Sequence, residues 1–211
     1  MNAMTVIEAQ TCEPKTFNLS GLDGISDKTL EIHFELYEGY VDQTNLLMEQ
    51  LSEMVVRHTA SAADSTYAEL KRHLGFEYGG MILHEFYFGN LAPKGRDNPS
   101  KKLLEALERG FGDFESWKSD FAAVGSIRGI GWAVLNEDPY TGILSNHWIE
   151  LHHQGVPPGF KPILAMDVWE HSYLLDYRPS ERKKYIDAFF ANIDWSAVNA
   201  RLLTPTNVAR A

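Results

Sequence analysis

The stretch Ile163-Leu-Ala-Met-Asp-Val-Trp-Glu-His171 decides how this chain is interpreted, because it sets a carboxylate and an imidazole four residues apart in an apolar run. An aspartate is rarely buried unless it is paired or binds a metal. A hard oxygen donor with an imidazole suits a redox-active first-row metal such as iron or manganese. Further ligands are then needed, and two isolated histidines, His33 and His84, are candidates.

Both histidines lie in stretches with helical periodicity. Ser26 is a plausible N-cap for a helix whose apolar face carries residues at three- and four-residue spacing, namely Leu30, His33, Tyr37, Tyr40, Thr44, Leu47 and Leu51. After Gly75 a second helical face carries Gly80, His84, Tyr87, Phe88 and Leu91. Residues 91–99 are rich in helix breakers and predict a linker, while residues 1–15 have no clear period and predict a loose tail. We therefore expect a helical hairpin domain over residues 16–92.

The second half of the chain predicts a different architecture over residues 99–211. Helical patterns at 103–111 and 113–124 precede three strand-like runs at 131–135, 142–152 and 162–166, and helices near 181–193 and 195–203 follow. The turn at Asp138–Gly142 favours a hairpin between the first two strands. The expected fold class is α+β, with the helical hairpin domain followed by a helix-flanked three-stranded antiparallel sheet.

Four segments resemble the iron/manganese superoxide dismutases. The stretch DVWEHSYLLDYRPSERKKYIDAFFANIDWSAVNARL resembles the C-terminal signature of the family, TLEIHFELYEGYV its first ligand helix, GGMILHEFYFGNLAP its second, and GIGWAVL its first strand. The segments occur in the order of the family and cover roughly residues 15–202. Each match alone is weak evidence for the family, whereas the four matches together are specific to it.

The resemblance implies one Fe or Mn ion per chain, with a solvent molecule as fifth ligand and four protein ligands: His33, His84, Asp167 and His171. It also implies a gateway role for Tyr40, and a hydrogen bond from Gln154 to the metal-bound solvent. Gly80 stands where iron-type members carry that glutamine, so the pair Gly80 and Gln154 looks manganese-like. Strand alternation from Ile149 would instead point His153 inward, which leaves His153 as a competitor for the role of Gln154.

The chain departs from the family at the gateway. Tyr37 stands in place of the gateway histidine, the spacing to Tyr40 is one residue shorter, and Leu174 replaces a tyrosine that reaches across the dimer. We expect the first helix to continue without a π-bulge, with Tyr37 beside Tyr40 on the His33 face and Leu174 as apolar packing. No family role matches His58, His73, His147 or His152, which predicts surface or second-tier positions for them.

The implied function is that of an antioxidant oxidoreductase that converts superoxide to oxygen and hydrogen peroxide, with Tyr40, Gln154 and Tyr37 near the reacting centre. The alternative is a non-catalytic metal-holding or partner-binding protein on the same fold. The resemblance also implies a homodimer, or a tetramer built from dimers, joined through Glu170 and His171.

The net charge of −10 disfavours a nucleic-acid partner, and no run of residues is apolar enough for a membrane span. A single cysteine, Cys12, and no recognisable signal peptide favour the cytoplasm.

Overall fold

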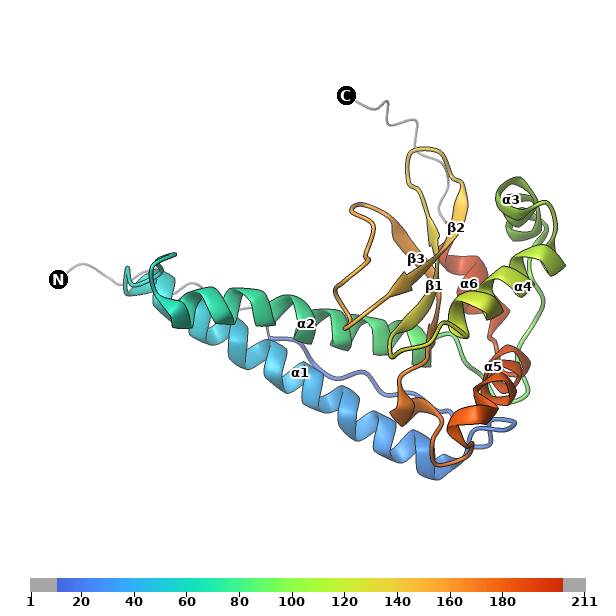
Figure 1. Cartoon of the computed structure of the whole chain (residues 1–211), viewed down its shortest axis with the longest axis horizontal. Helices are drawn as coiled ribbons and strands as arrows, with labels where there is room; N and C mark the ends of the chain where they lie inside the picture. The colour runs from blue at the N-terminus through green and yellow to red at the C-terminus, as the bar shows by residue number, and fades with distance from the viewer. Residues whose placement is uncertain (1–10, 203–211) are drawn as a thin grey trace.

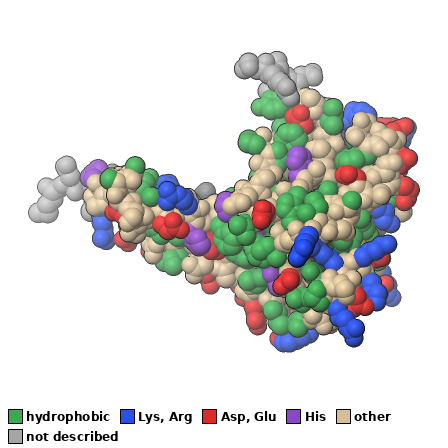
Figure 2. Space-filling view, viewed as in Figure 1, with side chains coloured by type: hydrophobic (Ala, Val, Ile, Leu, Met, Phe, Trp, Pro, Cys, Tyr) green, Lys and Arg blue, Asp and Glu red, His purple; other side chains and the backbone are tan. Residues whose placement is uncertain are grey.

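The structure is a computed structural model that describes residues 11–202, and its first part is a long helical hairpin (Figure 1). Helix α1 spans Asp27–Val56 and helix α2 spans Ser65–Phe88. The side chain of Ser26 accepts a hydrogen bond from the Thr29 amide, which confirms the predicted N-cap. Asp64 caps α2 in the same way. The hairpin projects from the body of the molecule as an arm (Figures 1 and 2).

The second part is a three-stranded antiparallel sheet with helices around it, which confirms the α+β class. Helices α3 (Lys101–Phe111) and α4 (Phe114–Gly125) come first, followed by strands β1 (Trp132–Glu137), β2 (Leu144–Ile149) and β3 (Lys161–Asp167). The strand order is β2-β1-β3. Two single turns, η1 (Glu170–Ser172) and η2 (Pro179–Glu181), lead to helices α5 (Arg182–Ala191) and α6 (Trp195–Arg201).

The central strand explains where the core lies. All six residues of β1 are buried, and so are the last five of β3, because these strands pair with each other and are covered by helices. The register sets Trp132 opposite Asp167, the last residue of β3. Hydrophobic side chains also gather on the surface of the body beside the hairpin (Figure 2). The end of β3 is thus the point where the body meets the arm.

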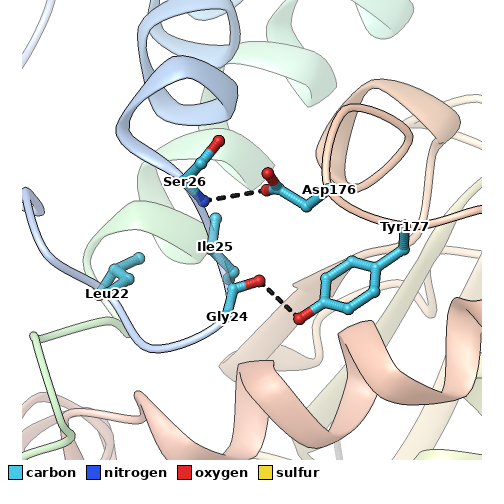
Figure 3. Close-up of a pocket in the computed structure, with 6 residues that line it drawn as sticks. All are labelled: Leu22, Gly24, Ile25, Ser26, Asp176 and Tyr177. Atoms are coloured by element: carbon cyan, nitrogen blue, oxygen red, sulfur yellow. Dashed lines mark hydrogen bonds between the residues drawn. The ribbon is translucent and has the colours of Figure 1, made fainter.

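Two junctions hold the arm against the body. Just past α2, the Asn90 amide group donates to the Ala165 carbonyl oxygen in β3 at 2.6 Å. At the start of α1, Asp176 accepts hydrogen bonds from the Ser26 amide and the Thr29 hydroxyl at 2.9 and 2.7 Å. The Tyr177 hydroxyl donates to the Gly24 carbonyl oxygen. The side chains of Asp176 and Tyr177 line a surface pocket of about 390 Å³ at this junction, and both are hydrogen-bonded to the segment just before α1 (Figure 3).

Three local expectations can now be compared with the structure. Helix α1 is a continuous α-helix, so the predicted absence of a π-bulge is confirmed. Strand β2 ends at Ile149, three residues before the expected end. Residues 1–10 of the expected loose tail lie outside the described residues, but Cys12 and Lys15 are hydrogen-bonded to the hairpin, so this part of the tail is not loose. Within residues 11–202, no helix is both long and apolar enough to cross a membrane.

Candidate metal centre

Four side chains from distant parts of the sequence meet at the end of β3. One ligand atom from each lies within 4.8 Å of the others, and the four residues are His33, His84, Asp167 and His171. The Asp167 Oδ2 atom lies 3.1 Å from the Nε2 atoms of His33 and His171, and 3.6 Å from Nε2 of His84. Three of the four residues are fully buried, and His171 is partly exposed. The structure therefore brings together all four predicted ligands.

Each half of the molecule supplies two of these groups. The α-helical hairpin sets the His33 and His84 rings edge to face, with centroids 5.0 Å apart. Asp167 is fixed at the strand end because its Oδ1 atom accepts the Trp169 amide at 2.7 Å and its carbonyl oxygen accepts the Tyr185 hydroxyl at 2.6 Å. His171 follows in the single turn η1, four residues after Asp167.

The hydrogen bonds of His84 favour a metal ligand over a core histidine. Its Nδ1 atom lies 2.6 Å from the Gly80 carbonyl oxygen, which can only accept, so Nδ1 carries the proton. The lone pair of Nε2 then faces the cluster, where this buried atom has no hydrogen-bond partner among the described residues. A ligating histidine commonly donates its second N–H to a backbone carbonyl in this way. A metal ion would satisfy the free Nε2 atom.

The protonation states also suit a metal ion. Burial lowers the pKa of His33, and burial with the nearby His33 lowers the pKa of His84 well below its usual range. Burial alone would raise the pKa of Asp167, but the charge and N–H group of His171 and the N–H group of His33 hold it well below the usual range. Neutral imidazoles of His33 and His84 beside the ionised Asp167 carboxylate suit a divalent or trivalent metal ion.

His152, not Gln154, is the polar residue behind the metal centre. Its Nδ1 atom accepts a hydrogen bond from Trp132 Nε1 at 2.9 Å, and its Nε2 atom lies 2.8 Å from the Tyr40 hydroxyl. The Trp169 ring stacks on the His152 imidazole with centroids 4.7 Å apart. His152 is 1% exposed, so it is not a surface residue and lies in the second tier, behind the ligands.

The reason lies in the backbone after β2. Leu151 and His152 adopt positive φ angles of 47° and 59°, and Glu150 and Gln154 bond to each other through their backbones. Strand alternation therefore stops at Ile149, and both Gln154 and His153 are exposed. The expected roles of these two residues at the bound solvent are corrected accordingly, and the manganese-like pairing of Gly80 with Gln154 loses its basis. Consecutive left-handed residues other than glycine leave little signal in a sequence.

The partners of His152 determine where its proton sits. The Trp132 indole N–H can only donate, so Nδ1 of His152 must accept. Burial lowers the pKa of His152 to about 4, which keeps the ring neutral near pH 7, with its proton on Nε2. That N–H donates to the Tyr40 oxygen. The hydroxyl proton of Tyr40 is then free to be donated to another group.

Gly80 makes room for Tyr40. A Cβ atom at Gly80 would lie 2.6 Å from the nearest ring carbon of Tyr40, closer than a side chain allows. The Tyr40 ring in turn stacks on the His84 imidazole, with centroids 5.1 Å apart. A larger residue at position 80 would displace Tyr40, so the polar group behind the site has to come from another element, the loop that carries His152.

The altered gateway differs from the expectation at Leu174. This residue was expected as apolar packing, but it is 39% exposed in the single chain and fills no buried space within it. Tyr37 is 1% exposed, and its hydroxyl bonds to the Lys15 amide and to the Glu85 carboxylate. Of the remaining histidines, His58 and His73 are exposed, and His147 bonds to Ser145 away from the cluster, as expected.

Comparisons with known proteins agree with this geometry. Residues 17–92 match the model of the iron/manganese superoxide dismutase alpha-hairpin domain, and residues 99–201 match that of the C-terminal domain. The chain is 39% identical over 183 residues to a superoxide dismutase [Fe] of Aquifex aeolicus, covering 85% of both chains. It is 38% identical over 178 residues to a superoxide dismutase [Mn] of Haloferax volcanii, covering 84% of this chain and 86% of the relative. The chain therefore belongs to the iron/manganese superoxide dismutases.

Proposed function

We propose that this protein is a superoxide dismutase that binds one Fe or Mn ion per chain through His33, His84, Asp167 and His171. The observation that carries the proposal is the buried cluster itself, in which Nε2 of His84 faces three other ligand atoms without a hydrogen-bond partner among the described residues. Three imidazoles and a carboxylate suit Fe and Mn better than Mg or Ca, which prefer oxygen ligands. The relatives are named for iron in some species and for manganese in others.

The protein residues have separate tasks in this proposal. When bound, the metal ion supplies one-electron chemistry, because it can take an electron from one superoxide and give an electron to a second. Asp167 and the three histidines would hold the ion, and the Asp167 carboxylate would balance part of its charge. The bond from His84 to the Gly80 carbonyl oxygen and the bond from the Trp169 amide to Asp167 orient two of the ligands.

Tyr40 and His152 supply and orient a proton for the substrate. Reduction of superoxide to hydrogen peroxide requires two protons, so the site needs a donor close to the metal. The His152 N–H group donates to the Tyr40 oxygen at 2.8 Å, which leaves the Tyr40 hydroxyl proton available to the substrate. Burial and the charges of Asp167 and Glu77 raise the pKa of Tyr40, so the phenol keeps its proton at neutral pH until a substrate oxygen accepts it.

The proposal is tested by turnover of superoxide together with elemental analysis. Protein loaded with iron or with manganese should consume superoxide in proportion to its content of one of these metals. Asp167→Asn keeps the size of the side chain but removes its charge, and should bind little metal; Gln154→Ala, at an exposed position, should match the unaltered protein. Full metal content without superoxide turnover would favour the non-catalytic alternative, and turnover independent of metal would refute the proposal.

We further propose a homodimer that forms over the turn η1. His171 is 21% exposed at its side chain, Glu170 beside it is exposed, and Leu174 and Leu175 are exposed apolar residues at 39% and 57%. A two-fold axis near this turn would let Glu170 of one chain reach His171 of the other and would cover the leucines. Such an interface would couple assembly to the orientation of a metal ligand.

Light scattering of purified protein tests the dimer. Glu170→Ala should shift the population toward monomer and weaken metal retention, whereas Glu49→Ala, an exposed glutamate on α1, should change neither. A protein that is monomeric with its metal bound would exclude this interface.

We also propose a cytoplasmic location, supported by a single cysteine per chain. Recovery of the protein from an oxidising compartment would contradict this location.

A further inference from the structure

The chain segment before α1 lies along the hairpin and is attached at both of its ends. We call residues 12–17 the N-terminal strap; the segment runs beside α1 and α2 in Figure 1. At one end the Cys12 amide donates to Asn45 Oδ1 at 2.8 Å, and Asn45 Nδ2 donates back to the Cys12 carbonyl oxygen at 2.9 Å. At the other end the Phe17 ring packs against Phe34 and Phe88, with centroids 6.4 and 5.3 Å apart.

Between these ends, the hydroxyl of Tyr37 joins the strap to both helices. It accepts a hydrogen bond from the Lys15 amide at 2.9 Å and donates to Glu85 Oε1 at 3.2 Å. The Lys15 ammonium group forms an ion pair with the other oxygen of Glu85. Tyr37 is on α1 and Glu85 is on α2, so one buried hydroxyl connects three segments of the chain.

These contacts adjoin both histidines of the hairpin. Glu85 follows His84 directly in α2, and the Tyr37 ring lies 6.5 Å from the His84 imidazole, centroid to centroid. Tyr37 is also one helical turn after His33. On the other side of the strap, the Phe88 ring that contacts Phe17 lies 4.9 Å from the His33 imidazole.

Such contacts matter because a metal site tolerates little variation in ligand position, of roughly half an ångström. The two histidines come from different helices, and their spacing depends on how α1 and α2 pack. We propose that Tyr37 is a positioning residue: by joining the N-terminal strap, α1 and α2 through its hydroxyl, it fixes His33 relative to His84 and slows release of the metal. This inference rests on the proposed metal site and assigns Tyr37 a role away from the substrate.

The test combines two measurements on the full chain. Tyr37→Phe keeps the ring and removes the hydroxyl. In the metal-free protein, the amides of residues 15–17 should exchange with solvent faster in this variant. In manganese-loaded protein, release of Mn²⁺ to excess EDTA should be roughly 10-fold faster, the lower end of the range for a residue that supports a metal ligand.

Two controls separate positioning from general loss of stability. Tyr67→Phe removes a hydroxyl from α2 about 25 Å along the helix from His84, and should change neither measurement. Val198→Ala removes buried groups from α6, outside the hairpin, and lowers global stability while the strap and its partners keep their side chains. Asn45→Ala loosens the far end of the strap, so it should also speed release of Mn²⁺, by a smaller factor than Tyr37→Phe.

Three results would overturn the inference. Tyr37→Phe could leave amide exchange in the strap unchanged, it could release Mn²⁺ no faster than Val198→Ala does, or Asn45→Ala could leave metal release unaltered. If the unaltered protein bound no Mn²⁺ or Fe²⁺ at all, the proposed function would fail instead, and the exchange measurement on metal-free protein would still report whether Tyr37 fastens the strap.

Discussion

At the scale of single residues, the Asp167 carboxylate lies next to all three histidines of the ligand cluster. It ends a buried strand, accepts hydrogen bonds from two imidazoles, and lies opposite Trp132 in the sheet register. Trp132 in turn donates to His152, which donates to Tyr40. These hydrogen bonds from Trp132 to His152 and from His152 to Tyr40 form a chain behind the ligand cluster. Substitution of a single residue in this chain should therefore have an effect that can be measured.

His152 and Gln154 allow a direct comparison of a buried and an exposed residue two positions apart. His152→Ala leaves the Trp132 indole N–H without its acceptor, and should lower the free energy of unfolding by about 1–3 kcal/mol. Gln154→Ala should change it by less than about 0.5 kcal/mol, because the side chain is exposed. Chemical denaturation of metal-free protein measures both. Equal effects, or a larger effect at Gln154, would show that the loop has a different conformation.

Tyr40 should separate turnover from metal binding. Its hydroxyl is bonded to His152 and it is not one of the four cluster residues. Tyr40→Phe should therefore leave the metal content nearly unchanged, while it lowers turnover or alters its pH dependence. Elemental analysis and superoxide consumption on the same sample provide the check. Loss of metal with the remaining turnover per metal unchanged would contradict the role assigned to Tyr40.

The metal-free protein should lose stability as the pH falls from about 6.5 to about 4. Burial lowers the pKa of His152 to about 4, while in the unfolded chain it is near 6.5. In this window the unfolded chain binds a proton that the folded chain does not, so unfolding becomes more favourable as the pH falls. His152→Gln should make the dependence shallower by up to about 1.4 kcal/mol per pH unit. Identical pH profiles for the two proteins would exclude His152 as a contributor.

At the scale of secondary-structure elements, the sequence predicts regular segments well and irregular ones poorly. The faces of α1 and α2 that carry His33 and His84 follow from helical periodicity, and Asp167 follows from the end of an apolar strand. The loop that presents His152 depends on two left-handed residues, and the attachment of Lys15 depends on a hydroxyl on another element. Hydrophobic periodicity predicts neither feature, because neither segment has a repeating pattern of apolar residues.

The close packing of α2 against Tyr40 gives a test at this scale. Gly80→Ala places a Cβ atom 2.6 Å from the Tyr40 ring, and should lower the free energy of unfolding by about 1–3 kcal/mol through overpacking. Gly75→Ala, in the same helix with no atom within 4 Å of the new Cβ, should raise it by about 0.5–1 kcal/mol. Thermal or chemical denaturation distinguishes the two. Stabilisation by both substitutions would mean that Tyr40 moves aside without cost.

At the scale of the whole molecule, the metal centre lies where two separately built parts meet. The hairpin carries two histidines of the cluster, and the sheet domain carries its aspartate and its third histidine, so neither part holds a complete site. The contacts of Asn90 with β3 and of Asp176 with the start of α1 hold the two parts together. The family membership follows from the sequence order of these segments, whereas their convergence on one point is visible only in the folded chain.

Anomalous X-ray diffraction from crystals of the iron- or manganese-loaded protein tests the central claim most directly. We predict one metal peak per chain, roughly 2 Å from one nitrogen each of His33, His84 and His171 and from a carboxylate oxygen of Asp167. A peak away from these four side chains, or crystals of active protein without a peak among them, would contradict the account.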